Sequence, residues 1–255
     1  MIHTANHRFV PPAPSWIVKR ITHWAHDHNL FVLPEHFHVI LGSALFYHLV
    51  YLMSPVIFRS LSYYKRCNKR GKINWNIHFV SMVQSLIILY LAFLVKDSEI
   101  LAADRVFGYD PRSADVFAMA CGYFLWDSLI CIRYFSYFGI GFVLHGVSSL
   151  FVFSFAFRPF LMYYGPSVLV YEASTPFLNL HWWTDKCDLT GSKFQLFNGI
   201  CLMITFFASR LIWGTLVAYW FFCKCEKHGF FVLYPIIIII IIIIIIIIIF
   251  ILLPF

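Results

Sequence analysis

Four ionisable side chains, those of Asp127, His145, Glu172 and Arg210, lie inside long apolar stretches of the 255-residue chain. An ionisable group at bilayer depth costs about 2.5 to 3.5 kcal/mol on insertion, so such residues tend to face the interior of a helical bundle and to mark functional sites. Two carboxyls and an imidazole on separate segments could orient a lipid headgroup, relay a proton or assist acyl transfer.

Asp127 and His145 each allow two interpretations. Asp127 has Tyr123 and Cys131 one helical turn away on its own face. It contacts a polar lipid group or relays a proton in one interpretation, and forms an interhelical hydrogen bond in the other. His145 shares a face with Ser148 and with small residues that let another backbone approach closely. Imidazole titrates near neutrality, so His145 is a candidate base, and its alternative role is a hydrogen bond to a neighbouring helix.

Glu172 begins a third polar group. In a helix, Thr175 and Asn179 would share its side, and Pro176 would leave the carbonyl of Glu172 without its usual donor. Broken helices of this kind occur in transporter and lipid-binding sites, and a purely structural kink is the alternative. Arg210 lies in the next apolar segment, where a cation needs a counter-charge that the two intramembrane acids could supply.

The segments that carry these residues indicate a membrane protein. The chain is 61% hydrophobic and 12% charged, whereas an average soluble domain carries about 25% charged residues. A helix needs about 20 apolar residues to cross the hydrocarbon core. The sequence predicts an all-α, multi-pass transmembrane helical bundle of about six to seven spans, at 36–58, 76–95, 114–134, 138–157, 160–183 and 194–222, with an apolar tail from about 230.

The fifth of these spans is predicted to be broken or re-entrant, because Gly165, Pro166, Glu172 and Pro176 interrupt it. Near its end, Trp182 and Trp183 have the positions of interface anchors.

Charge predicts the orientation of the bundle. The loop after the first span carries basic residues and no acidic ones between positions 59 and 72, whereas the next loop, 96–113, is mixed. The first loop should therefore be cytosolic and the N-terminus lumenal. The basic residues behind the net charge of +7 flank the predicted spans and are explained by membrane topology. We therefore expect no nucleic-acid partner.

The chain is expected to divide into four parts. Residues 1–35 are an N-terminal extramembrane segment, 36–69 hold the first span and the basic loop, 70–222 form the main membrane domain, and 223–255 are a hydrophobic C-terminal segment. The last part contains an unbroken isoleucine run from Ile236 to Ile249. It is long enough to span, but a homopolymer specifies no packing face, so it is either a last span or a sequence artefact.

The polar segments together resemble the TLC domain family, which includes ceramide synthases and translocon-associated membrane proteins. The likeness covers about residues 70–222 and is closest to the small TLC-domain-containing transmembrane proteins. Its most specific feature is the string from Glu172 to Asn179. The other features are Asn74-Trp75-Asn76 with His78 and Ser81, Gly122-Tyr123 with Asp127, and His145 with Ser148.

The chain departs from the ceramide synthase pattern at the residues to which catalysis is attributed. Those enzymes carry adjacent histidines and a His-Asp-x-x-Asp element. Here Gly146 follows His145, and Thr184 precedes Asp185 and Asp188. The resemblance therefore does not carry catalysis over to these residues, and the two aspartates are expected to be solvated loop carboxylates.

The resemblance implies a protein of the endoplasmic reticulum that binds or senses membrane lipids, such as sphingolipids, and acts in lipid homeostasis. We expect a mostly apolar cavity in which Asp127, His145, Glu172, Thr175 and Asn179 contact the headgroup. Membrane lipids are the expected partners, with other membrane proteins or a second copy of the chain as further ones. No metal and no cofactor are expected.

Two other functions remain open at this stage. One is a ceramide-synthase-like N-acyltransferase with acyl-CoA as co-substrate, in which His145 is the base and Asp127 orients the imidazole. The other is an ion-coupled transporter built around the broken fifth segment, although no internal repeat supports it. A scaffold that only packs against partner proteins is the residual possibility.

Overall fold

The computed structural model describes residues 8–227, and the isoleucine run lies outside this range. Within it, five helical stretches are long and apolar enough to cross a membrane: α2 (Leu33–Phe58), α4 (Lys69–Val95), α6 (Pro111–Arg133), α7 continuing into a 3₁₀ turn (Phe135–Phe157), and Lys193–Trp220. The last comprises α10 (Lys193–Phe206), the π-helical turn η5 (Phe207–Trp213) and the first part of α11 (Gly214–Lys227). These helices confirm the all-α multi-pass bundle.

The helices begin where the sequence supplies capping groups. The Asn68 side chain accepts a hydrogen bond from the backbone N–H of Gly71 at the start of α4. Asp110 accepts from the backbone N–H groups of Arg112 and Ser113 at the start of α6, and Pro111 occupies the first turn. A side-chain acceptor at this position satisfies N–H groups that the helix itself leaves without partners.

The surface of the long helices is apolar, as expected against lipid. Leu45 and Leu49 of α2 and Phe197 and Met203 of α10 are among many large hydrophobic side chains that are half or more exposed. A water-facing helix would carry polar residues at such positions. Hydrocarbon is therefore the medium that covers this surface.

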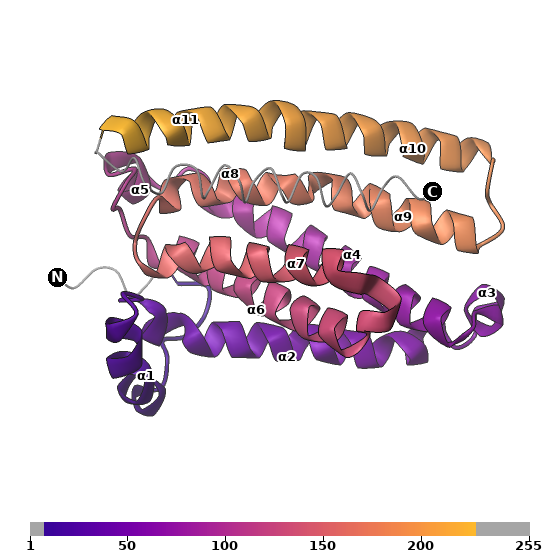
Figure 1. Ribbon diagram of the computed structural model, residues 1–255, viewed down its shortest axis with the longest axis horizontal. Helices are drawn as coiled ribbons and strands as arrows, with labels where there is room; N and C mark the ends of the chain where they lie inside the picture. The colour runs from indigo at the N-terminus through magenta and orange to yellow at the C-terminus, as the bar shows by residue number, and fades with distance from the viewer. Residues whose placement is uncertain (1–7, 228–255) are drawn as a thin grey trace.

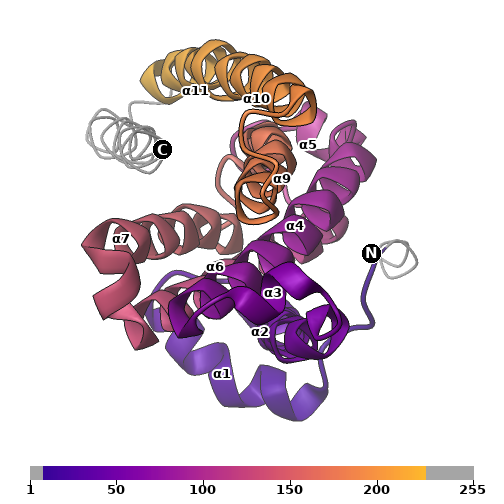
Figure 2. The ribbon, with the colours of Figure 1, turned by 90° about the vertical axis from the view of Figure 1, so that its right-hand side faces the viewer.

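The long helices run along one axis and form an open arc around α6 (Figures 1 and 2). The buried helix α6 packs against α2, α4 and α7, while α9 packs between α4 and α10. Seen along the long axis, α7 lies at one end of the arc and α10 with α11 at the other (Figure 2).

Small residues allow the closest helix contacts in this arrangement. A Cβ atom at Gly122 of α6 would lie 2.5 Å from the carbonyl oxygen of Ile40 and 2.6 Å from Cβ of Ser43, both on α2. A Cβ atom at Gly146 of α7 would lie 2.6 Å from Oγ of Ser128 on α6. Glycine is therefore needed at both crossings for the backbones to approach.

The segment between α7 and α10 is broken, as predicted. It consists of the 3₁₀ turn η3 (Met162–Tyr164), α8 (Gly165–Leu169), the 3₁₀ turn η4 (Val170–Ser174) and α9 (Thr175–Lys186). Pro176 lies in the first turn of α9, where the missing N–H costs nothing. The proline therefore starts a new helix after a tighter turn that contains Glu172.

Three short helices lie at the ends of the bundle: α1 (Ser15–Asp27), α3 (Ser62–Arg66) and α5 (Glu99–Ala103). Near α3, Arg66 Nη2 lies 2.5 Å from a carboxylate oxygen of Asp188, and Arg70 Nη2 donates to the carbonyl of Tyr137 at 2.9 Å. The loops after α2, α6 and α9 therefore share one end. This geometry agrees with chain segments that alternate in direction, while which end faces the cytosol stays a prediction.

Candidate functional site

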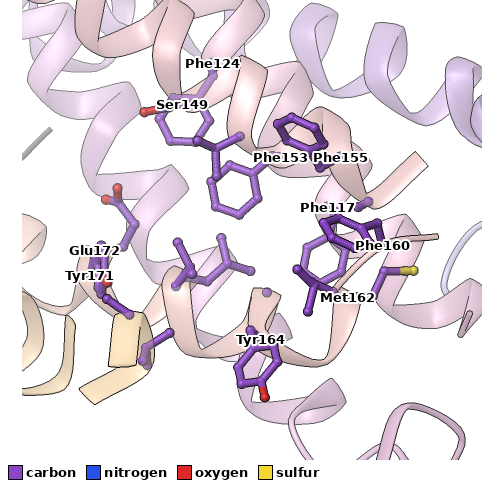
Figure 3. Close-up of a pocket in the computed structure, with 18 of the residues that line it drawn as sticks. Phe117, Phe124, Ser149, Phe153, Phe155, Phe160, Met162, Tyr164, Tyr171 and Glu172 are labelled. Atoms are coloured by element: carbon purple, nitrogen blue, oxygen red, sulfur yellow. The ribbon is translucent and has the colours of Figure 1, made fainter. Parts of the chain in front are cut away.

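A cavity of about 140 Å³ lies between α6, α7, the broken segment and α11. Its wall is mainly aromatic and aliphatic, and Phe117, Phe153, Phe160 and Tyr164 surround the space in Figure 3. Val152 from α7 and Val217 from α11 also line it, so the cavity occupies the region between the two ends of the arc. Apolar walls with few polar groups are typical of sites for small hydrophobic ligands.

Leu161 lines this wall with an unusual backbone. Its φ of 56° is in the left-handed region, which a branched side chain rarely adopts. Its N–H donates to the carbonyl of Val106 at 2.7 Å, and its side chain is buried. Surrounding structure holds such strain most often at functional sites.

Three of the four ionisable residues noted in the sequence line the same cavity. His145 comes from α7, Glu172 from η4 and Arg210 from the π-helical turn η5. Arg210 is buried and its Nε donates to Oγ of Ser174 at 3.2 Å. Single π-helical turns often occur at functional sites.

Glu172 is the electrostatic centre of this polar end. It is half-buried and close enough to Arg210 and to Asp127 of α6 to interact electrostatically with each of them. Asp127 does not line the cavity. It lies behind the α6–α7 contact, where a Cβ atom at Gly146 would be 3.1 Å from its Oδ2. The structure therefore places Asp127 outside the cavity wall, unlike the other three ionisable residues.

Two polar atoms of the lining residues have no hydrogen-bond partner within the described part of the chain. They are Nδ1 of His145 and the hydroxyl of Tyr171. Buried polar groups are nearly always hydrogen-bonded, and an exception calls for an unseen partner. A ligand with a polar head in the cavity would supply one.

Thr175 and Asn179 are buried but do not line the cavity. The amide of Asn179 donates to Oγ of Ser81 at 3.1 Å, and its Oδ1 lies 2.7 Å from Nδ1 of His78. The His78 ring stacks on Trp182 with centroids 4.3 Å apart. This stack fills the space at the level of Asn179, so the structure divides the predicted polar set into a cavity group and a packed group.

Trp182 is therefore not the interface anchor that its position predicted. Its side chain is buried and packs with Tyr64 and Trp75. The basic loop and α3 cover this end of α9, which removes Trp182 from the lipid surface.

The described residues do not join Asp127 and His145 by a hydrogen bond. A base and its orienting acid need to lie within hydrogen-bond reach. Among the described residues, the hydrogen bond found for the Asp127 carboxylate comes from the Cys131 thiol at 3.9 Å, and Nδ1 of His145 has no partner. No group of three or more His, Cys, Asp or Glu within residues 8–227 is placed to hold a metal ion.

Asp185 lies in the last turn of α9, and Asp188 lies in the loop that follows. Asp185 accepts hydrogen bonds from Nζ of Lys186 at 2.8 Å and from the hydroxyl of Thr190 at 2.9 Å. These two donors hold the pKa of the Asp185 carboxyl below its usual value. Asp188 pairs with Arg66, so both aspartates are occupied outside the bundle.

Comparison with known proteins gives the family. The TLC domain matches residues 74–254 of the chain. The chain belongs to the TLC domain family. The matched range contains His145, Glu172 and Arg210, and therefore all the ionisable residues that line the cavity.

Several relatives are similar over most of this TLC domain protein. An uncharacterized TLC domain-containing protein of Schizosaccharomyces pombe is 44% identical over 82% of this chain and 73% of its own length. Topoisomerase I damage affected protein 4 of Saccharomyces cerevisiae is 31% identical over 78% of this chain and 74% of its own. TLC domain-containing protein 4 of Homo sapiens is 32% identical over 66% and 64%. No solved structure matches the chain significantly.

Gln84 is a polar residue of the cavity wall that was not among the residues predicted from the sequence. Gln84 is buried and accepts a hydrogen bond from the hydroxyl of Tyr47. It lies within the predicted second span, so the rule that selected the ionisable residues would have found it if amides had been included. Ser149 is one of the small residues that helical spacing places on the face of His145, and the structure puts it on the cavity wall.

Proposed function

We propose that this TLC domain protein binds a membrane lipid in the cavity between α7 and α11 and acts in lipid homeostasis. One observation supports the proposal above all: His145, Glu172 and Arg210 come from three separate elements and line one apolar cavity. Placing an ionisable side chain in a bilayer costs free energy, so such residues usually face the interior of the bundle and mark a functional site.

The architecture fits a ligand with an apolar chain and a polar head. In Figure 3, Glu172 and Tyr171 lie at one side of the space, and Phe117, Phe160 and Met162 lie at the other. A head that accepts from Arg210 and donates to Glu172 would satisfy both charges. The chain would lie against the aromatic wall and be held by van der Waals packing, because a lipid that comes from the bilayer gains no free energy of transfer from water.

The family resemblance supports a place in the endoplasmic reticulum and sphingolipids as candidate ligands. The basic loop after the first span supports a lumenal N-terminus. Asp127 would tune the charge of the polar end through Glu172. Thr175 and Asn179 would stabilise the broken segment that presents Glu172, since Asn179 bonds to α4.

The test is the lipid that copurifies with the full chain. Ser149 lies on the cavity wall, and Ser149→Phe would fill the space. Val147 is on the same helix with 46% of its side chain exposed, so Val147→Phe is the matched control. We expect mass spectrometry of extracted lipids to show several-fold less bound lipid for Ser149→Phe and no change for Val147→Phe.

A second filling variant guards against misfolding. Val168→Phe fills the cavity from α8, whereas Ser149→Phe fills it from α7. Equal lipid content in both filling variants and in the unaltered protein, with a normal gel-filtration profile, would contradict lipid binding in this cavity.

A further inference from the structure

The helix α1 lies across one end of the bundle, crosswise to the spans (Figure 2). Its inner side packs on α2, with Ala25 completely buried. Ile17 and Ile21 are partly buried and lie on the same side at helical spacing. The helix therefore has one side fixed to the protein and another that the protein does not cover.

The uncovered side combines indole rings with cations. Trp16 is 69% and Trp24 is 53% exposed, and the exposed Arg20 lies between them at a spacing of four residues. These three side chains form one stripe of the helix. Tryptophan is enriched at the membrane–water interface, where its ring meets the headgroups.

A second stripe lies beside the first. Lys19, His23 and His26 line a shallow hollow on α1 together with Val18 and Thr22. The acidic residue of the helix is Asp27, which lies 3.8 Å from Nε2 of His23. The exposed side of α1 is therefore basic overall.

Contacts on both sides of α1 hold the helix in its crosswise position. Before it, Nε2 of His38 lies 2.9 Å from the carbonyl oxygen of Pro11. After it, Arg158 Nη2 donates to the carbonyl of His28 at 3.2 Å, and the N–H of Val32 donates to the carbonyl of Phe157 at 3.2 Å. Since α2 begins at Leu33, α1 lies at the depth where a span ends.

From this placement we propose that α1 binds the anionic phospholipid headgroups of the leaflet at its end of the bundle. Trp16 and Trp24 lie among the headgroups and glycerol backbones, and Lys19 and Arg20 contact the phosphate and carboxylate oxygens. An interfacial helix gains affinity from buried apolar area together with attraction between basic residues and anionic lipid. This binding surface lies apart from the cavity and does not depend on its function.

The test compares amide hydrogen exchange of residues 15–27 in the full chain, reconstituted in nanodiscs of phosphatidylcholine or of phosphatidylcholine with phosphatidylserine. A basic residue near an anionic surface contributes about fivefold to association. We expect exchange in α1 to be at least about fivefold slower with phosphatidylserine, and the difference to shrink in high salt as the Debye length falls.

The double variant Lys19→Glu/Arg20→Glu should lose this difference between the two lipids. Lys193→Glu is the matched control, because Lys193 is equally exposed but begins α10. Equal exchange in both lipids, or a difference that survives in the double variant, would overturn the proposal. In the first case an acidic protein partner would become the better candidate for this side of α1.

Discussion

Arg8 Nη2 donates a hydrogen bond to Oδ1 of Asp115 at 2.6 Å, joining residues that lie 107 positions apart in the chain. The same oxygen lies 2.7 Å from Nδ1 of His36, whose Nε2 lies 2.8 Å from the hydroxyl of Tyr109. His36 and Asp115 are completely buried. The Asp115 carboxylate therefore links the N-terminal segment and α2 to α6.

Removing this carboxylate should destabilise the protein strongly. In Asp115→Ala the Arg8 cation, whose side chain is 9% exposed, would lose its counter-charge. Breaking a buried ion pair by removing one partner costs about 3 to 5 kcal/mol. We expect a clear fall in the midpoint of thermal unfolding, measured on the detergent-solubilised chain.

The control for Asp115→Ala is Glu35→Ala. The carboxylate of Glu35 lies 4.0 Å from Arg8, but its side chain is 57% exposed. Exposed pairs contribute about 0 to 1 kcal/mol, so this variant should melt close to the unaltered protein. Similar midpoints for the two variants would show that the Asp115 cluster does not hold the fold together.

Gly122→Ala should also destabilise the protein, through packing alone. The added methyl would lie 2.5 Å from the carbonyl oxygen of Ile40 and 3.0 Å from the N–H nitrogen of Ala44, so α2 would have to move away from α6. Overpacking of this kind costs about 1 to 3 kcal/mol. Denaturant unfolding of the reconstituted protein measures the loss.

Gly42→Ala is the matched substitution for Gly122→Ala. Gly42 is in α2, and nothing lies within 4 Å of the position that an added methyl would take. Alanine is the better helix former by about 1 kcal/mol, so this variant should keep or gain stability. A loss at Gly42 as large as that at Gly122 would refute the close contact as the cause.

The spans were predictable because a bilayer imposes a length and a composition on every helix that crosses it. The break near Glu172 was predictable for a related reason, since Pro176 and Gly165 interrupt an otherwise apolar run. The π-helical turn around Arg210 was not predictable. The surrounding residues are as apolar as those of a regular helix, and the turn follows from packing against η4.

Part of the cavity wall was predictable from the free-energy cost of placing ionisable residues in a bilayer. Glu172, His145 and Arg210 were selected as ionisable residues at bilayer depth, and all three line it. Whether a residue reaches the cavity depends on how its helix is rotated about its own axis, which the sequence does not give. Asn179 was therefore predicted to contact the ligand, although the stack of His78 on Trp182 fills the space beside it.

The Asp115 cluster escaped the sequence analysis for a different reason. Asp115 lies at the edge of a predicted span, where a charged residue is normally assigned to the adjoining loop. Its partner Arg8 comes from a segment that sequence periodicity cannot place, because the pairing depends on contacts far apart in the chain. An acidic residue one turn inside a span, close to a helix start, is the signal that could have identified it.

Asp185→Asn should lower stability slightly at neutral pH. The folded pKa of Asp185 is lowered by the hydrogen bonds from Lys186 and Thr190. Its contribution is therefore present above the usual aspartate value of about 3.9 and is lost as the pH falls through the folded pKa. Because the side chain is partly exposed, we expect a difference below about 1 kcal/mol.

The measurement for Asp185→Asn is the unfolding midpoint as a function of pH, with bound lipid quantified in parallel. The variant and the unaltered protein should converge in acid, and their lipid content should be equal at neutral pH. Asp188→Asn should leave lipid content unchanged as well, because Asp188 pairs with Arg66 at the surface. A loss of lipid in either variant would tie these carboxylates to the binding site.

Arg210 and Glu172 should be energetically coupled. Arg210→Met leaves the carboxyls of Glu172 and Asp127 without the cation that interacts with Glu172, and Glu172→Gln leaves the buried Arg210 with less counter-charge. Each single change is expected to destabilise the protein and to reduce bound lipid. The double variant should lose less stability than the sum of the two, by about 0.5 to 3 kcal/mol.

A double-mutant cycle on unfolding free energies measures this coupling. The control cycle replaces Arg210→Met by Arg133→Met, since Arg133 is exposed at the end of α6, and it should be additive with Glu172→Gln. Additivity within about 0.5 kcal/mol in the Arg210 cycle would show that the two side chains act independently. Arg210 would then be held by Ser174 and by the ring of Phe206, and a lipid head that bridges the two charges would have no electrostatic basis.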